Sequence, residues 1–88
     1  MPCFLVSYEL PPGADIALQA AIKSYPGWAR ITATTWAVVT DVGGTATGVR
    51  NYLQEHAGAV ARMFVVRSSG EAAWNNVQCN SHWLQQAL

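Results

Sequence analysis

The chain has 88 residues, enough for one domain and near the lower end of what folds on a single core without disulfides or metals. It is 51% hydrophobic and 11% charged, and five Lys or Arg balance five Asp or Glu. A net charge of zero excludes a global positive field that would draw the chain to phosphate polymers. Because the apolar share exceeds what one small core needs, we expect a homodimer.

Neither the cysteines nor the start of the chain suggests export. Cys3 and Cys79 lie too far apart in sequence to indicate a disulfide framework. Met1 leads into a strand pattern and not into a charged segment followed by an apolar one. The longest apolar runs are much shorter than the roughly 20 residues that span a bilayer as a helix. We therefore expect a cytoplasmic protein without a membrane partner.

The first predicted element is a strand over residues 3–10. Its side chains alternate between two sets that both begin apolar, which indicates a central strand covered on both faces near its start. The sequence Pro11-Pro12-Gly13 ends it, because two successive residues lack a backbone donor. An amphipathic helix is predicted next, with Asp15 as its cap and its end at Pro26-Gly27.

A β-hairpin and a second helix follow. Residues 28–34 and 35–40 are rich in β-branched and aromatic side chains and predict two strands with a turn near Ala33-Thr34. The Gly43-Gly44 pair is expected to be a loop before a helix that is capped by Thr45 or Thr47. Apolar residues then recur at helical spacing until Gly58 closes the helix.

The last predicted strand covers residues 61–67 and has apolar side chains on both faces. Residues 71–88 show weak periodicity, with Ser81 as an expected cap for a final turn of helix. The order β-α-β-β-α-β predicts an α+β, ferredoxin-like domain over residues 1–70, with a four-stranded antiparallel sheet and two helices on one face. Because the strands are apolar on both faces, we expect the second face to be covered by the 71–88 tail, by a partner copy, or by both.

Several segments together resemble a known family. They are the opening strand that ends in Tyr8-Glu9-Leu10, the sequence SYPGWARITATTWAVVTD, the helix VRNYLQEH, the strand FVVRSSGEAAW and the closing HWLQQAL. The chain resembles the small bacterial proteins labelled SinR-like. At a greater distance it is similar to the superfamily of the ferredoxin-like CRISPR-associated adaptation proteins and the VapD-type toxin ribonucleases.

The wider resemblance implies a symmetric homodimer packed through its sheet faces, with a role associated with RNA or DNA. In active members an Asp at the end of the first strand faces its twin and is proposed to bind a divalent metal for phosphodiester cleavage. That position here is Glu9, which the resemblance makes both a metal ligand for Mg²⁺ or Mn²⁺ and the catalytic residue. Its side chain is one methylene longer than Asp, and Mg²⁺ demands near-ideal octahedral geometry at roughly 2.0–2.1 Å.

The other functional candidates each have a structural alternative. Arg30 and Arg67 could neutralise phosphate in a nucleic-acid complex, whereas Glu9 could be only the solvated end of a strand. Glu71 is either a site acid or the ion-pair partner of Arg62 or Arg67. The alternative for the whole chain is a dimeric scaffold or protein-interaction module without catalysis.

A zinc site is a further option with little support. Cys79 and His82 have the spacing of half a zinc site, which Cys3 and His56 could complete only if the fold brought them together. His56 lies on the apolar stripe of its helix, a position more typical of a packed histidine than of a base.

Overall fold

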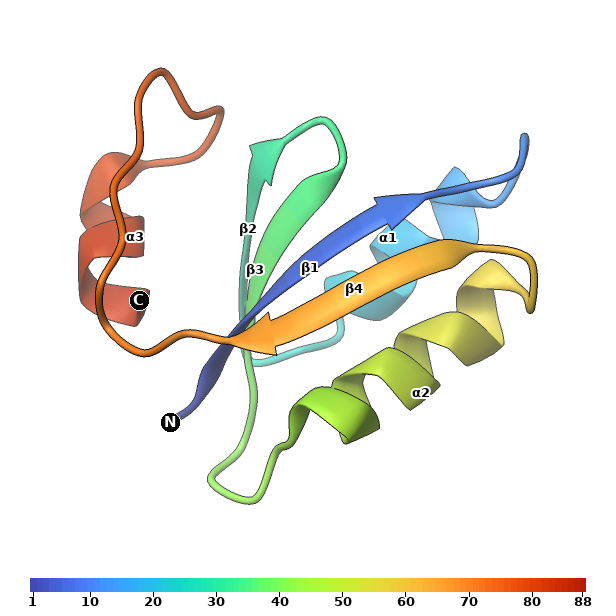
Figure 1. Cartoon of the computed structure of the whole chain (residues 1–88), viewed down its shortest axis with the longest axis horizontal. Coiled ribbons are helices and arrows are strands. Elements are labelled where there is room, and N and C mark those ends of the chain that lie inside the picture. Colours follow the sequence, from blue (N-terminus) through green and yellow to red (C-terminus); the bar gives the residue numbers. More distant parts are fainter.

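The computed structural model describes all 88 residues and has an α+β fold with one sheet and three helices (Figure 1). In chain order the elements are β1 (Cys3–Glu9), α1 (Asp15–Ile22), β2 (Gly27–Thr32), β3 (Thr35–Val39), α2 (Ala46–Ala57), β4 (Arg62–Arg67) and α3 (Ser81–Ala87). None of the helices has the length and apolar character needed to cross a membrane.

The sheet is open and has the strand order β2-β3-β1-β4, with every neighbouring pair antiparallel. β1 is central, so that Phe4 lies opposite Val38 of β3 on one side and opposite Arg67 of β4 on the other. The β2–β3 hairpin turns at residues 33–34, as the sequence predicts. β2 and β4 are therefore the two edges of the sheet.

One face of the sheet carries the main hydrophobic core, which α1 and α2 cover. The alternation of β1 turns Phe4, Val6 and Tyr8 towards these helices, and each of these side chains is buried. The helices, β3 and the residue before β4 contribute the remaining buried members of this face: Leu18, Ala21, Ile22, Trp36, Val38, Val49, Leu53, Ala57 and Ala61. The apolar stripes visible in the sequence are thus the surfaces that fix both helices to the sheet.

A single side-chain hydrogen bond crosses this core. The indole N–H of Trp36 donates to the hydroxyl of Tyr8 over 2.8 Å, in a buried setting. A buried donor without a partner is costly, so this bond removes a penalty that two large aromatic side chains would otherwise bring into the core.

We expect Tyr8→Phe to lower the free energy of unfolding by about 1–3 kcal/mol, because it leaves the Trp36 indole N–H buried without an acceptor. Denaturant unfolding monitored by tryptophan fluorescence measures the change. Tyr52→Phe is the matched control: the Tyr52 hydroxyl meets Ser24 Oγ at 3.0 Å in an exposed position. Equal stability of the two variants would show that the buried bond contributes nothing.

The helix ends follow local rules, with two differences from the sequence prediction. Thr45 caps α2, its hydroxyl accepting from the Gly48 N–H over 3.0 Å. α1 begins after Ala14 without a side-chain cap, because Asp15 lies inside the first turn. At α3 the cap is Asn80 and not Ser81; its side-chain oxygen accepts from two N–H groups of the first turn.

The second face of the sheet is only half covered. α3 and the preceding tail segment lie on the opposite side of the sheet from α1 and α2 (Figure 1). There Leu84 packs against Cys3 and Ala37 in a smaller buried cluster. On the β4 side of the same face, Phe64 remains 67% exposed and Val66 42% exposed. The tail therefore completes a second core over β3 and the start of β1 and leaves β4 open.

Candidate functional site

Glu9 ends β1 on the face that α1 and α2 do not cover. Its register partner on β4 is Arg62, and Oε1 of Glu9 lies 3.7 Å from Nη1 of Arg62. Both side chains are largely exposed, at 76% for Glu9 and 82% for Arg62. An ion pair this exposed contributes at most about 1 kcal/mol. The structure thus pairs Arg62 with Glu9 and not with Glu71.

Arg30 is held by contacts within the chain. Its guanidinium lies 5.3 Å from the Trp36 ring centroid, and Nη2 donates to the Ala33 carbonyl over 2.8 Å. Its Nε is buried without a hydrogen-bond partner. Arg30 thus stacks on the Trp36 ring and donates to the β2–β3 turn, so its position is fixed by contacts within the hairpin.

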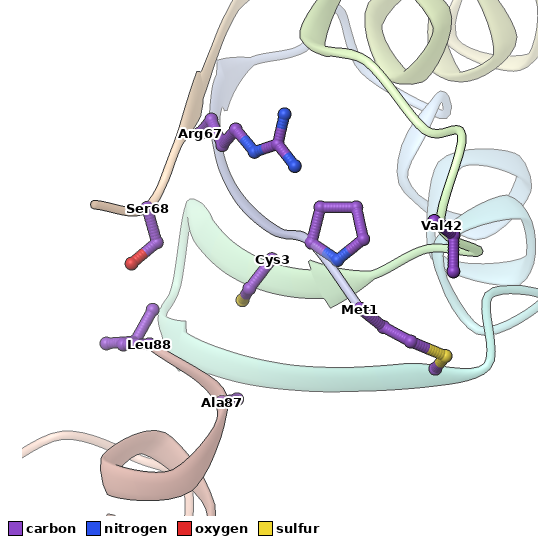
Figure 2. Close-up of a pocket in the computed structure, with 8 residues that line it drawn as sticks. Met1, Cys3, Val42, Arg67, Ser68, Ala87 and Leu88 are labelled. Carbon is purple, nitrogen blue, oxygen red and sulfur yellow. The ribbon is translucent and has the colours of Figure 1, made fainter. Parts of the chain in front are cut away.

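Arg67 ends β4 and is more accessible. Its guanidinium lies 5.7 Å from the Phe4 ring centroid. It also borders a hollow of about 420 Å³ between the N-terminal residues and the end of α3. Figure 2 shows Arg67 and Ser68 on the β4 side of this hollow and Leu88 on the α3 side. Arg67 is the single charged side chain in that lining.

The three candidates from the sequence are not brought together within one chain. Glu9 lies opposite Arg62 and Arg67 lies opposite Phe4, at the two ends of the β1–β4 pair. Five residue steps along a strand correspond to roughly 16–17 Å. Arg30 is on the far edge strand, opposite Trp36, and so faces the helix layer. A phosphate beside Glu9 would therefore be beyond the reach of both arginines of the same subunit.

No group of three or more His, Cys, Asp or Glu side chains is arranged to hold a metal ion. Cys3 belongs to the small cluster under α3, and burial raises the pKa of its thiol. His56 is exposed on α2, where its Nδ1 lies 2.9 Å from the Tyr52 carbonyl. The raised pKa keeps the Cys3 thiol protonated, and a protonated thiol is neither a nucleophile nor a metal ligand.

A second hollow, of about 400 Å³, lies at the start of α2. It is lined by the Gly43-Gly44 loop, Thr40, Asp41 and Thr45, together with Tyr25 and Pro26. Thr45 already caps the helix and the Thr40 hydroxyl donates to the Asp41 carbonyl, so these two hydroxyls act within the loop itself.

An exposed apolar surface on the open half of the sheet is the more distinctive feature. We call Leu5, Phe64 and Val66 the β4 strip; Phe64 and Val66 are exposed, and Leu5 is half-buried beside the cluster under α3. Leu5 lies directly opposite Val66, and Phe64 follows two residues away on the same face of β4. Side chains in these relations are in contact range across a sheet. The sequence signal for the strip is the apolar character of both faces of residues 62–67.

Comparison with models of known protein families, with characterised proteins and with solved structures found no match.

Proposed function

We propose that the protein is a homodimer that serves as a scaffold or protein-interaction module without catalysis. The observation that carries this proposal is the β4 strip, where Phe64 and Val66 stay exposed although a helix covers the other half of the same face. In a chain that is only 11% charged, large side chains left in water beside a free strand edge favour association.

The geometry of the polar residues supports the same proposal. Each chain offers one carboxylate at the end of β1, and Arg62 already neutralises it. Mg²⁺ is usually held by one or two carboxylates together with substrate phosphates, and neither Arg30 nor Arg67 is placed to hold a phosphate next to Glu9. Within one chain, a metal ion at Glu9 would thus have a single carboxylate ligand and no nearby Arg30 or Arg67 to hold the phosphate.

A second candidate is a metal-dependent nuclease with a role in RNA or DNA metabolism. The element order and the strand order β2-β3-β1-β4 support assigning the chain to the ferredoxin-like arrangement. This candidate takes the chain to be related to the CRISPR-associated adaptation proteins and the VapD-type ribonucleases, which are proposed to share that arrangement. One observation favours this candidate: Glu9 is exposed on the face without α1 and α2, where its twin could approach in a face-to-face dimer. Mg²⁺ or Mn²⁺ bound there would polarise a phosphate and activate water.

A cleavage assay separates the two candidates. Labelled RNA and DNA are incubated with the purified protein in Mg²⁺, in Mn²⁺ and in chelator, beside Glu9→Gln and the control Glu71→Gln. The scaffold predicts no metal-dependent cleavage by any of the proteins. Cleavage that needs metal, is lost in Glu9→Gln and persists in Glu71→Gln would overturn it and assign Glu9 to the active site.

A further inference from the structure

The two edges of the sheet differ in how they are protected. On β2 the ladder is irregular between Arg30 and Thr32, and the Ile31 carbonyl there accepts a hydrogen bond from the Gln78 N–H over 3.0 Å. A bulge and a bonded tail segment are two of the ways in which proteins stop an edge strand from pairing further. On β4 no strand lies on the outer side.

The main-chain groups that β4 presents outwards follow from the hydrogen-bond pattern. The Ser68 N–H donates to the Cys3 carbonyl over 2.9 Å, so residue 68 directs its main chain at β1. Alternation along an antiparallel strand gives Val66 and Phe64 the same direction. Met63, Val65 and Arg67 therefore direct their N–H and C=O groups away from the sheet, at its free edge.

The directions on β1 agree with this assignment. The Tyr8 N–H donates to the Thr34 carbonyl over 3.1 Å, and the Pro2 carbonyl accepts from the Thr40 N–H over 3.0 Å. Even-numbered β1 residues thus turn their main chain to the β3 side, and odd-numbered ones turn it to β4.

We propose that two copies of the chain associate by antiparallel pairing of their β4 edges about a twofold axis at Val65. This inference rests on the homodimer of the proposed function and specifies its interface. Val65 pairs with Val65 of the second copy, and Met63 pairs with Arg67 of the second copy. These pairs exchange up to about six main-chain hydrogen bonds. The product is one continuous sheet with the order β2-β3-β1-β4-β4-β1-β3-β2.

The side chains fit this register. On the open face Phe64 lies opposite Val66 of the second copy, twice by symmetry, and an aromatic side chain opposite a β-branched one is a favourable cross-strand pair. Arg67 lies opposite Met63 and Arg62 opposite Ser68, so no two like charges are directly opposed. A twofold axis at Phe64 would instead set Arg62 against Val66. The axis at Val65 also joins the two β4 strips into one apolar surface.

This dimer keeps the two Glu9 carboxylates apart. Glu9 lies opposite Arg62 of its own chain. In the proposed register Arg62 lies opposite Ser68 of the second copy, and that Ser68 is level with Cys3 of the same copy. Glu9 of the second copy is six residues further along its strand, or roughly 20 Å away. The two carboxylates could not share one metal ion, so edge pairing and a metal bridged by two Glu9 residues exclude each other.

Val65→Pro tests the interface, because it removes the outward N–H on the axis and leaves the β1–β4 ladder intact. Sedimentation of the full chain over a concentration series is expected to show a wild-type dimer. The dissociation constant of the variant is expected to rise by about 10- to 100-fold, because each of the two copies loses one hydrogen bond at the axis. Circular dichroism confirms that the variant folds. If it does not fold, Phe64→Lys takes its place, with Ile16→Lys on the exposed side of α1 as the matched control.

Cross-linking tests the register. In the Cys79→Ser background, a Phe64→Cys chain mixed with a Val66→Cys chain is expected to form a heterodimeric disulfide on oxidation. In the proposed register these two positions form a non-hydrogen-bonded pair, in which the Cα atoms lie about 4.5 Å apart. That separation is within the range of a disulfide. A homodimeric disulfide of Phe64→Cys alone would place the axis at Phe64 and overturn the register.

The outcomes also separate this inference from the proposed function. A wild-type protein that sediments as a monomer overturns both. A dimer whose dissociation constant is unchanged by Val65→Pro and by Phe64→Lys keeps the homodimer and overturns edge pairing.

Discussion

Leu84→Ala is expected to lower the free energy of unfolding by about 2–5 kcal/mol, because Leu84 is 1% exposed and fills the space between α3 and the sheet. Its neighbours Cys3 and Ala37 come from β1 and β3 and cannot move into the cavity without disturbing the central ladder. Urea unfolding at fixed protein concentration measures the change, since association would also affect the midpoint.

Gln85→Ala is the control for that experiment, because Gln85 is exposed on the same helix and such changes usually stay within about 0.5 kcal/mol. If Leu84→Ala were as mild as Gln85→Ala, α3 would not belong to the folded core, and the tail would be an appendage of a domain that ends near residue 70.

Gly44→Ala is expected to destabilise the protein by about 1–3 kcal/mol through overpacking. A Cβ at this position would collide with the Oγ1 and Cβ atoms of Thr40. Thr40 cannot easily withdraw, because it is buried, its N–H donates to the Pro2 carbonyl and its hydroxyl donates to the Asp41 carbonyl. Thermal unfolding followed by circular dichroism gives the difference.

Gly43→Ala is an almost ideal comparison, since a Cβ on the neighbouring glycine would meet nothing within 4 Å. The two variants have the same composition and differ by one position in the loop. Equal melting temperatures would mean that the loop adjusts freely around Thr40 and that Gly44 is not required there.

The elements of the fold could be predicted because their signals are local. Alternation over β1, the turn between β2 and β3, and the glycine that closes α2 are each visible within a few residues. α1 stops at Ile22 and not at Tyr25 because the next N–H groups, of Ser24 and Tyr25, bond three residues back in a tighter turn. The choice of Asn80 over Ser81 as a cap lies within the usual error of one residue.

The surroundings of the candidate site could not be predicted in the same way. The ion pair of Glu9 with Arg62 depends on the register between β1 and β4, which are far apart in sequence. The same register places Arg67 beside Phe4, at the other end of the β1–β4 pair from Glu9. Arg30 has a role in stacking on Trp36 that follows from the β2–β3 pairing and its irregularity. The two β1–β4 relations are set by pairing between segments far apart in sequence, whereas the Arg30 relation is set by the register of the hairpin. A shift of register by one residue would change each of them, and the apolar pattern along the chain does not show which register forms.

The central position of β1 also affects how the chain is made. β1 is synthesised before both of its strand neighbours, β4 ends only at Arg67, and the cover for its second face, around Leu84, follows later still. Contacts between such distant parts of a chain form slowly, because the intervening segment must be ordered first. On the ribosome, β1 could pair with β3 once residues 35–39 had emerged, but its other edge and its second face would stay uncovered until β4 and Leu84 followed. Apolar surface exposed during that interval makes a nascent chain prone to aggregation.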